Sequence, residues 1–516
     1  MPSKPITVHE GAAQVFHEAL LGDKRLELPA KVLELAEKTT FDPSTISEPY
    51  LPIPLKFTES SAGLWALAST YANAIVRERF GIEQSVSVNT DLASLFLASG
   101  LLARVDGKPL TDPGLVARYQ DDRFFHLHGS LNPDKTLSMV GLPLDRPELT
   151  DEREIINEYS KTIAQYDSHW LDIESNERLR QAGTICLTPD EFLASEQGKA
   201  IADDPIYLLE QSDEDSLPPI LDLSRVIAAP TISKLAALYG ATVVRVSCST
   251  EPELGFLLVD GNLGKHDTTI NLKSPEGRQQ LLGLLQDADV VVDGYRPGAL
   301  DKLGFGYRYL QEVGRRRGKG IILVKENCYG WHGPETHRSG WQQISDCFTG
   351  VSWLMGKFLK LDEPVVPPLP NSDYQTGIIG LIGILAAVDR RANQGGSFLV
   401  RVSLNQYNRF LLSLGEYPEE TLAALRGQHA DLELRHYHTI FIAVEKLLCS
   451  LRKSVPTLFQ AAYWGDIKSQ YGKGDGESET LTYVRAPTTF EKTNLGYDVG
   501  SCFPGTYEPV WPSTSG

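Results

Sequence analysis

The sequence of 516 residues has little of what usually assigns a chain to a class at first sight. Its six cysteines are scattered without a CxxC pair, which argues against a disulfide scaffold and against a zinc site of common spacing. No apolar run is long enough to span a bilayer, and the N-terminus lacks the apolar region of a secretory signal. The net charge of −18 argues against general binding of polyanions. We therefore expect a cytoplasmic protein that binds neither nucleic acid nor membrane.

Length and hydrophobic patterning indicate an α/β protein with more than one domain. A chain this long exceeds what one core usually supports. After an acidic stretch at 212–216, the best candidate for a domain boundary, apolar runs rich in β-branched residues alternate with helical patterns. Such runs are typical of parallel strands buried on both faces. We predict a doubly wound parallel sheet, with strands at 220–223, 241–246, 290–292 and 321–324 and helices at 230–239 and 275–288.

The chain also contains an internal repeat. Glu59 and Asp373 lie 314 positions apart, and pairing them aligns the two stretches without a gap, with Gly63 opposite Gly377. The matched stretches share the order loop, helix, strand, helix, which isolated chance matches rarely do. We therefore expect two copies of one module, of which the first, carrying Glu59, is degenerate.

Asp373 is the most informative single residue. It lies between a proline-rich loop at 364–370 and a long apolar run at 378–387, so the sequence predicts that it begins a buried helix. Free backbone N–H groups and the helix dipole favour an anion there. Taken alone, the heptapeptide at 371–377 is more typical of a simple helix cap, because Asp is a good capping residue. The residues upstream of it favour a chemical role instead.

Several motifs, in order over residues 218–415, resemble those of the family III CoA-transferases of the CaiB/BaiF type. They lie at 222–230, 238–246, 264–265, 271–277, 295–304, 330–341 and 372–377. Residues 110–205 resemble the small domain of that family more loosely, and the long tandem form is similar to that of filamentous fungi. The resemblance implies a Rossmann-like large domain, a smaller α+β domain and an interlocked architecture.

The resemblance and the repeat together predict four regions. Residues 1–109 would be the degenerate first copy of the large-domain helix module. Residues 110–205 would form the small α+β domain. Residues 206–430 would form the Rossmann-like, CoA-binding catalytic domain, and residues 431–516 a loop-rich C-terminal segment. The protein would be either a homodimer or a monomer in which the two copies form an internal pseudo-dimer.

Basic residues lie at or after the ends of the predicted strands of the large domain: Arg245 at a strand end, Lys273 just before a helix, and Arg296 and Lys302 after a strand. One such residue is more often solvated surface, but four at successive strand ends indicate a phosphate site, because these ends converge on a ligand crevice. By correspondence with the family, other residues would line the CoA pocket: Ile227, Ala228, Asn271, Gly294, Tyr295, Gly340, Trp341 and Gln342. His126 and His128 lack a third ligand nearby, so we expect no metal site.

The family's chemistry implies that Asp373 is a catalytic nucleophile that carries CoA between carboxylic acids. The substrates would be an acyl-CoA and a carboxylic acid acceptor, with no tightly bound cofactor. Ile227 departs from the pattern, because some members carry a polar side chain there, next to the reacting thioester.

Two alternatives stay open within the same fold. A 2-methylacyl-CoA racemase would need an acid/base pair for two-sided proton transfer, but Trp341 stands where those relatives carry a histidine. The half-lost first copy would also suit a catalytically inactive acyl-CoA-binding relative.

Overall fold

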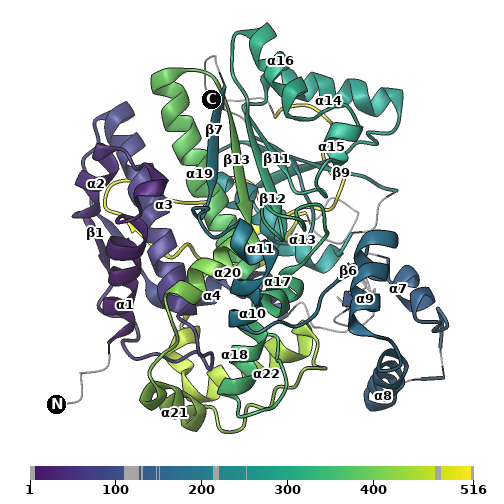
Figure 1. The fold of residues 1–516 in the computed structure, drawn as a ribbon. Coiled ribbons are helices and arrows are strands. Elements are labelled where there is room, and N and C mark those ends of the chain that lie inside the picture. Colours follow the sequence, from purple (N-terminus) through teal and green to yellow (C-terminus); the bar gives the residue numbers. More distant parts are fainter. Residues whose placement is uncertain are drawn as a thin grey trace.

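The computed structural model describes residues 6–109, 127–128, 132–146, 148–149, 151–212, 220–250, 253–470 and 478–512. Its largest element is a seven-stranded sheet (Figure 1). The strands, in spatial order, are β10 (Lys265–Thr269), β9 (Val243–Ser247), β8 (Ile220–Leu223), β11 (Val290–Asp293), β12 (Ile322–Asn327), β13 (Ser397–Ser403) and β7 (Leu208–Ser212). Six run parallel, and β7 pairs antiparallel at the edge. The predicted α/β class is confirmed. Most of the predicted acidic boundary, 213–216, lies outside the described residues.

Helices cover both faces of this sheet because its strands are apolar on both sides. Val290 and Val292 pack into a core with the helices α12 (Ala228–Leu238) and α19 (Asn371–Gln394). Val291, which points the other way, packs with α14 (Pro275–Asp287) and α16 (Tyr307–Arg317). Figure 1 shows α19 on one side of the sheet and α14 and α16 on the other. Burial of each such side chain stabilises the fold by roughly 1.5–3 kcal/mol.

The order of the strands reverses between β8 and β11. From β8 the chain proceeds to β9 and β10 on one side, and then returns to β11, β12 and β13 on the other. In open parallel sheets, a ligand crevice forms outside the carboxyl ends of the strands at such a reversal. Strand β12 runs three residues beyond the predicted end at 324, because its backbone pairs with β13 as far as Asn327 and Ser403.

The same succession of elements recurs 314 positions apart. Helix α3 (Phe57–Phe80) and α19 are both 24 residues long, and they begin at residues 57 and 371. Strand β2 (Val86–Val88) and helix α4 (Thr90–Phe96) follow α3, as β13 and α20 (Leu404–Ser413) follow α19. Strand β2 has a parallel neighbour, β1 (Thr39–Phe41), and an antiparallel one, β16 (Thr488–Phe490), just as β13 has β12 and β7. Helices α3 and α19 contribute to one core.

The elements before α3 are α1 (Val8–Gln14), the π-helix Val15–Leu20, the short helix Lys24–Leu26 and α2 (Ala30–Ala36). After α4, α5 (Ser99–Leu102) leads to β3 (Arg104–Val105) and β4 (Lys108–Pro109). Three shorter helices follow strands of the large sheet: α13 (Gly255–Gly261), α15 (Ala299–Lys302) and α17 (Gln342–Phe348). Helix α18 (Val351–Phe358) precedes the proline-rich loop, and helix α21 (Glu419–Gln428) follows α20.

A smaller unit stands apart from the large sheet (Figure 1). Its described elements are β5 (Leu127–His128), α7 (Asp134–Met139), α8 (Glu152–Ile163), α9 (Ser168–Ile173), the π-helix Glu174–Arg178 and β6 (Ala182–Gly183). Leu137, Val140 and Leu142 form a hydrophobic cluster of their own within it. Helices α10 (Pro189–Ala194) and α11 (Glu196–Ala200) lead back to the main body. Residues 110–126 of the predicted small domain, His126 included, lie outside the described residues.

The C-terminal segment contains more regular structure than its loop-rich sequence suggests. Helix α22 (Ile440–Ser454) is followed by the hairpin of β14 (Trp464–Ser469) and β15 (Glu479–Val484). Strand β15 pairs with β3, and β16 pairs with β2, so the end of the chain completes sheets that residues 1–109 begin. None of the described helices is long and apolar enough to cross a membrane.

Candidate active site

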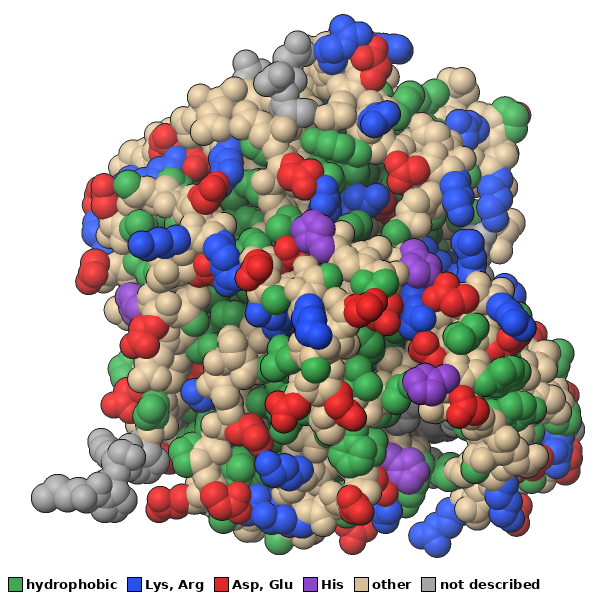
Figure 2. Space-filling model, in the orientation of Figure 1, with side chains coloured by type: hydrophobic (Ala, Val, Ile, Leu, Met, Phe, Trp, Pro, Cys, Tyr) green, Lys and Arg blue, Asp and Glu red, His purple; other side chains and the backbone are tan. Residues whose placement is uncertain are grey.

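A cavity of about 570 Å³ lies at the carboxyl ends of β8, β9, β10, β11 and β12, beside the reversal of strand order. Its walls come from the segments that follow these strands, from the loop before α17, from the start of α19 and from the smaller unit. Acidic and basic side chains are interspersed over the face of the molecule in Figure 2, so that face carries no broad field of one sign. An anionic ligand must therefore be held by cations of the cavity itself.

Asp373 lies in the first turn of α19 and lines this cavity. It is not a cap: the N-cap position is Pro370, and no side chain makes a capping hydrogen bond there. Burial raises the pKa of the Asp373 carboxyl group well above its usual value, and the charges of Glu326 and Asp346 raise it further. The carboxyl group therefore faces a ligand space from a site that disfavours a permanent charge.

The close packing of α19 on α12 fixes where Asp373 points. A Cβ atom added to Gly377 would lie 2.4 Å from Cγ2 of Thr231 and 3.4 Å from the carbonyl oxygen of Ala228. Both of these residues belong to α12, and Ala228 also lines the cavity. A glycine one turn after Asp373 thus lets the first turn of α19 lie directly against the start of α12.

The guanidinium groups of Arg225 and Arg296 lie at the cavity, and the charge of Arg180 acts on Arg296. Arg225 and Arg296 line it, and Arg225 Nε lies 3.6 Å from Glu253 Oε1. Burial lowers the pKa of Arg296, and the positive charges of Arg180 and Arg225 lower it further. Positive charges this close together attract an anion into the space between them. A single guanidinium group can bind two phosphate oxygens at once. Lys273, just before α14, also lines the cavity.

Most of the residues predicted from the sequence meet at this cavity. Those that line it are Ile227, Ala228, Asn271, Lys273, Gly294, Tyr295, Arg296, Gly340, Trp341 and Asp373. Arg245, Lys302 and Gln342 do not line it.

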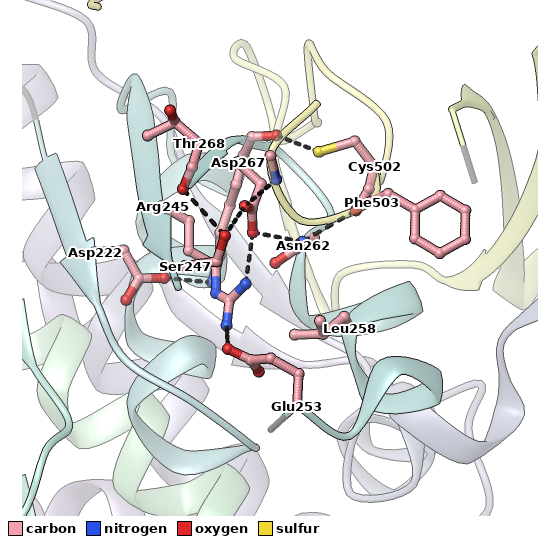
Figure 3. A network of polar contacts seen from close by, with 12 residues as sticks. Asp222, Arg245, Ser247, Glu253, Leu258, Asn262, Asp267, Thr268, Cys502 and Phe503 are labelled. Carbon is pink, nitrogen blue, oxygen red and sulfur yellow. Dashed lines mark hydrogen bonds and ion pairs between the residues drawn. The ribbon is translucent and has the colours of Figure 1, made fainter. Parts of the chain in front are cut away.

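Arg245 is fully buried in an ion-pair network (Figure 3) and does not line the cavity. Its Nη1 lies 2.5 Å from Asp267 Oδ2, and its Nη2 lies 2.9 Å from Glu253 Oε1. Strand β9 continues to Ser247, so Arg245 lies within the strand instead of at its end. With two carboxylates already neutralising it, Arg245 is part of the structural core and not a free cation for a phosphate.

Lys302 and Gln342 are absent from the cavity wall for simple geometric reasons. Lys302 ends the short helix α15 with an exposed side chain. Gln342 begins α17, and its side chain turns inward, where its Nε2 donates a hydrogen bond to Asp346. Asp346 also accepts one from Asn408 at 2.8 Å, so Gln342 belongs to a buried polar network behind the cavity wall. Burial raises the pKa of Asp346 to about 7.

Trp341 connects the cavity to the smaller unit. Its ring stacks on His128, with ring centroids 4.5 Å apart and an angle of 14° between the planes. Arg338, from the same loop, forms ion pairs with Asp172 and Glu177 at 3.1 and 2.9 Å. No group of three potential metal ligands occurs among the residues that the structure describes.

Sequence reasoning missed several polar residues of the cavity wall, among them Arg225, Glu326 and Arg338. Burial raises the pKa of Glu326 to about 8, and the charge of Asp293 adds to this. The signal for Glu326 was present, because a Lys-Glu-Asn run directly follows a buried apolar strand. In a parallel sheet, such a run falls at the edge where ligands bind.

The corresponding position of the first copy is closed. Glu59 is buried, and both of its carboxyl oxygens accept a hydrogen bond from the Tyr417 hydroxyl at 2.7 Å. Gly11 of α1 lies against it, since a Cβ atom there would be 2.8 Å from Glu59 Cγ. Burial raises the pKa of Glu59 to about 7. Glu59 is thus packed within the protein, whereas Asp373 lines an open cavity.

The chain is similar to proteins of known class. The family model described as "CoA-transferase family III" matches residues 219–417. The chain is 35% identical to "Acetyl-coenzyme A transferase nodX" of Hypoxylon pulicicidum, over 98% of this chain and 94% of that one. It is 29% identical to an "Acyl-CoA transferase" of Gibberella moniliformis, over 70% of this chain and 71% of that one.

Among solved structures, Rv3272 of Mycobacterium tuberculosis in its orthorhombic form is 18% identical, with a TM-score of 0.41, over 59% of this chain and all of that one. The predicted resemblance is confirmed by the match over nearly the full length of the Hypoxylon protein and by the family model. The chain belongs to CoA-transferase family III.

Proposed function

We propose that this protein moves CoA from an acyl-CoA to a carboxylic acid, with Asp373 as the catalytic nucleophile. One observation carries the proposal: a single cavity holds both the Asp373 carboxyl group and the arginines Arg225 and Arg296. A carboxylate can attack a thioester, and the arginines can hold the phosphates of CoA in the same space. No tightly bound cofactor is needed, because CoA itself is part of the substrate.

We propose that CoA lies along the carboxyl edge of the sheet. Its phosphates would contact Arg225, Lys273 and Arg296, which follow β8, β10 and β11 and precede helices. The rest of CoA would lie against Ile227, Ala228, Asn271, Gly294, Tyr295, Gly340 and Trp341. Arg245, Lys302 and Gln342 are left out of this proposed contact set, for the geometric reasons given above.

The proposed reaction has two matched halves. The Asp373 carboxylate attacks the donor thioester, the C–S bond breaks, and a mixed anhydride and CoA thiolate result. The thiolate then attacks the Asp373 carbonyl carbon, which releases the donor acid and leaves an aspartyl-CoA thioester. The acceptor carboxylate attacks that thioester and expels the thiolate. The thiolate finally takes the new acyl group and restores the Asp373 carboxylate.

The racemase alternative lacks its usual base here. Trp341 cannot accept an α-proton, and no histidine is among the described residues that line the cavity. The two reactions also differ in a direct observable. A racemase would exchange the α-proton of its acyl-CoA with solvent deuterium without a free acid, whereas a CoA-transferase would move CoA without α-exchange.

We also propose the wider architecture. The sheet with helices on both faces would be the doubly wound, Rossmann-like CoA-binding domain of the interlocked family architecture. Residues 206–430 would form that catalytic domain, 110–205 the small domain and 1–109 the degenerate copy, with 431–516 as the C-terminal segment. The Hypoxylon relative suggests acetyl-CoA as the first donor to test, with a role in fungal acyl or secondary metabolism.

The test is a covalent adduct on Asp373. Wild-type protein mixed with acetyl-CoA and a panel of free acids should transfer CoA to at least one acid. Without an acceptor it should carry an adduct on the peptide containing Asp373, which hydroxylamine releases. Asp373→Asn should lose both activities while still binding CoA, because an amide cannot form the anhydride.

The matched control is Glu59→Gln, which changes the corresponding carboxyl group in the closed copy. It should keep the transfer activity almost unchanged. An active Asp373→Asn enzyme, with deamidation excluded by mass spectrometry, would end this mechanism. An inactive Glu59→Gln would mean that the wrong copy has been assigned.

A further inference from the structure

We propose that Glu326 is the hydrogen-bond donor that receives the carboxylate of the acceptor acid beside Asp373. The inference rests on the proposed transferase function and assigns a role to a second carboxyl group of the same cavity. It makes acceptor binding dependent on one proton at a defined residue.

Backbone pairing fixes the position of Glu326. Strand β12 extends past its apolar run, and Glu326 pairs in register with Val402 of β13. The side chain lines the cavity together with that of Asp373. Its neighbours along the strand have other partners: Lys325 lies 3.7 Å from Asp293 Oδ2 and 3.6 Å from Asp301 Oδ2, and Asn327 holds the turn at Gly330.

Acidic groups lie near Glu326, although the cations Arg225, Lys273 and Arg296 line the same cavity. Beyond the effect of burial, the charge of Asp293 of β11 raises the pKa of Glu326. The charge of Glu326 in turn adds to burial in raising the pKa of Asp373 of α19 and that of the Cys328 thiol on its own segment. Asp346 of α17 adds its charge to Asp373 from behind the cavity wall. The nearby cations Lys325 and Arg338 are engaged: Lys325 faces Asp293 and Asp301, and Arg338 is held by Asp172 and Glu177.

Within the described part of the chain, no hydrogen bond joins the Glu326 side chain to another residue. A partly buried carboxyl group with acidic neighbours retains its proton at neutral pH, and its pKa is raised to about 8 by burial and then by Asp293. A neutral carboxyl group can donate, and its strongest acceptor is a carboxylate. The cavity therefore holds a donor that has no acceptor among the described residues.

The acceptor acid supplies that missing carboxylate. It enters the cavity as an anion, next to carboxyl groups that would repel it if they were all ionised. In the attack on the aspartyl-CoA thioester, one acceptor oxygen forms the new C–O bond, the C–S bond breaks, and the thiolate leaves. The other oxygen stays hydrogen-bonded to Glu326, which keeps its own proton throughout. The same contact holds that oxygen as it becomes the carbonyl of the anhydride.

The test measures the KM for the acid as a function of pH. The probe is the exchange of labelled acetate into acetyl-CoA, or, if acetate is not accepted, of the acid with the highest turnover in the panel above. In the wild type, the KM for the acid should rise as the pH increases through about 8, because the ionised form of Glu326 cannot donate. Glu326→Gln keeps a donor that does not ionise, so its KM should stay flat over the same range.

Glu326→Ala should raise the KM for the acid about tenfold or more at neutral pH, the effect of losing one charge-assisted hydrogen bond. The Kd for CoA, which carries no acyl group, should change less than about twofold in both variants and serves as the test of folding. Glu59→Gln, which removes a buried carboxyl group outside the cavity, should retain the wild-type pH profile.

The outcomes separate the two proposals. If the wild type transfers CoA to no acid, the proposed function fails and the inference falls with it. If the wild type is active and the alkaline rise in KM persists in Glu326→Gln, the inference alone is overturned. An unchanged KM in Glu326→Ala would overturn it as well.

Discussion

Two acidic residues at equivalent positions of the repeat show how surroundings decide what a carboxyl group can do. Glu59 and Asp373 both lie in the first turn of a 24-residue helix, and burial raises the pKa of both. Glu59 accepts hydrogen bonds from Tyr417 and is covered by α1. Asp373 instead lines a cavity that also holds arginines. Of the two positions, only that of Asp373 lines a cavity, which is why we propose Asp373 as the nucleophile.

Arg296 gives a prediction for binding. Replacing Arg296 with Ala should weaken the binding of CoA by roughly 1.5–3 kcal/mol, the range for a hydrogen bond to a charged group. The affinity of the wild type should also fall as salt is added, because the contact is electrostatic. Isothermal titration calorimetry with CoA measures both effects.

Arg316→Ala is the matched control, since Arg316 is exposed on α16 and pairs only with Glu312 among the described residues. It should leave the affinity for CoA unchanged. An Arg296→Ala protein that binds CoA as tightly as the wild type would remove Arg296 from the proposed phosphate site.

At the scale of single residues, the structure places Asp373 and Arg296 at the cavity, as the sequence leads one to expect, but places Arg245 outside its lining. The first two depend on local signals, a loop before an apolar helix and a loop after an apolar strand. The role of Arg245 depends on Asp267, which comes from the neighbouring strand, and on where β9 ends. Whether a buried cation is already paired is decided by tertiary contacts that no local pattern contains.

At the scale of elements, the packing of α19 against α12 determines where the candidate active site, with Asp373, lies. Both helices are almost entirely buried, so α19 is set by packing and not by solvent. Gly377 gives the closest approach, and the first copy repeats this device: a Cβ atom on Gly63 would lie 2.6 Å from Val15 Cγ1. In both copies a glycine four residues after the carboxylate lets a second helical segment cross closely.

Gly377→Ala should therefore destabilise the protein and reduce transfer. The new methyl group would collide with Thr231 and approach the backbone of Ala228, and such overpacking costs roughly 1–3 kcal/mol. Moving α19 away from α12 would also move Asp373. Thermal unfolding should show a lower Tm, and the transfer assay a lower kcat.

Gly283→Ala is the contrasting substitution in α14. A Cβ atom there would meet nothing within 4 Å. Because Ala favours the helix more than Gly does, the substitution should leave the free energy of unfolding unchanged or raise it by roughly 0.5–1 kcal/mol, and the Tm should stay the same or rise. If the two substitutions lower the Tm equally, the close approach at Gly377 does not position α19.

Element boundaries were predicted well where hydrophobic runs end sharply and less well where pairing extends a strand. Strand β8 has the predicted limits 220–223, and α14 the predicted start at 275. Strand β12 continues through polar residues because β13 continues beside it, and this brings Glu326 to the cavity. The hairpin of β14 and β15 was missed because part of its pairing is with β3, more than 370 residues earlier.

At the scale of the whole molecule, the two copies pack as partners. Helices α3 and α19 share one hydrophobic core, and Ser60 of α3 lies 3.0 Å from the Tyr407 hydroxyl, which accepts from Asn371 of α19 at 2.8 Å. The smaller unit occurs beside the second copy, and the C-terminal strands β15 and β16 join sheets begun in the first. The contacts that a family dimer would make between chains can thus be made within one.

We therefore expect the protein to be a monomer in dilute solution. Multi-angle light scattering over a series of dilutions should give the chain mass of 57.0 kDa, with transfer activity per molecule unchanged across the series. The physical reason is that α3 already buries the face of α19 that a second chain would otherwise cover, so a partner gains little further apolar burial. A mass twice this value at every dilution would show an obligatory dimer and would exclude the internal pseudo-dimer. A dimer that dissociates on dilution without loss of activity would leave the single chain as the complete catalytic unit.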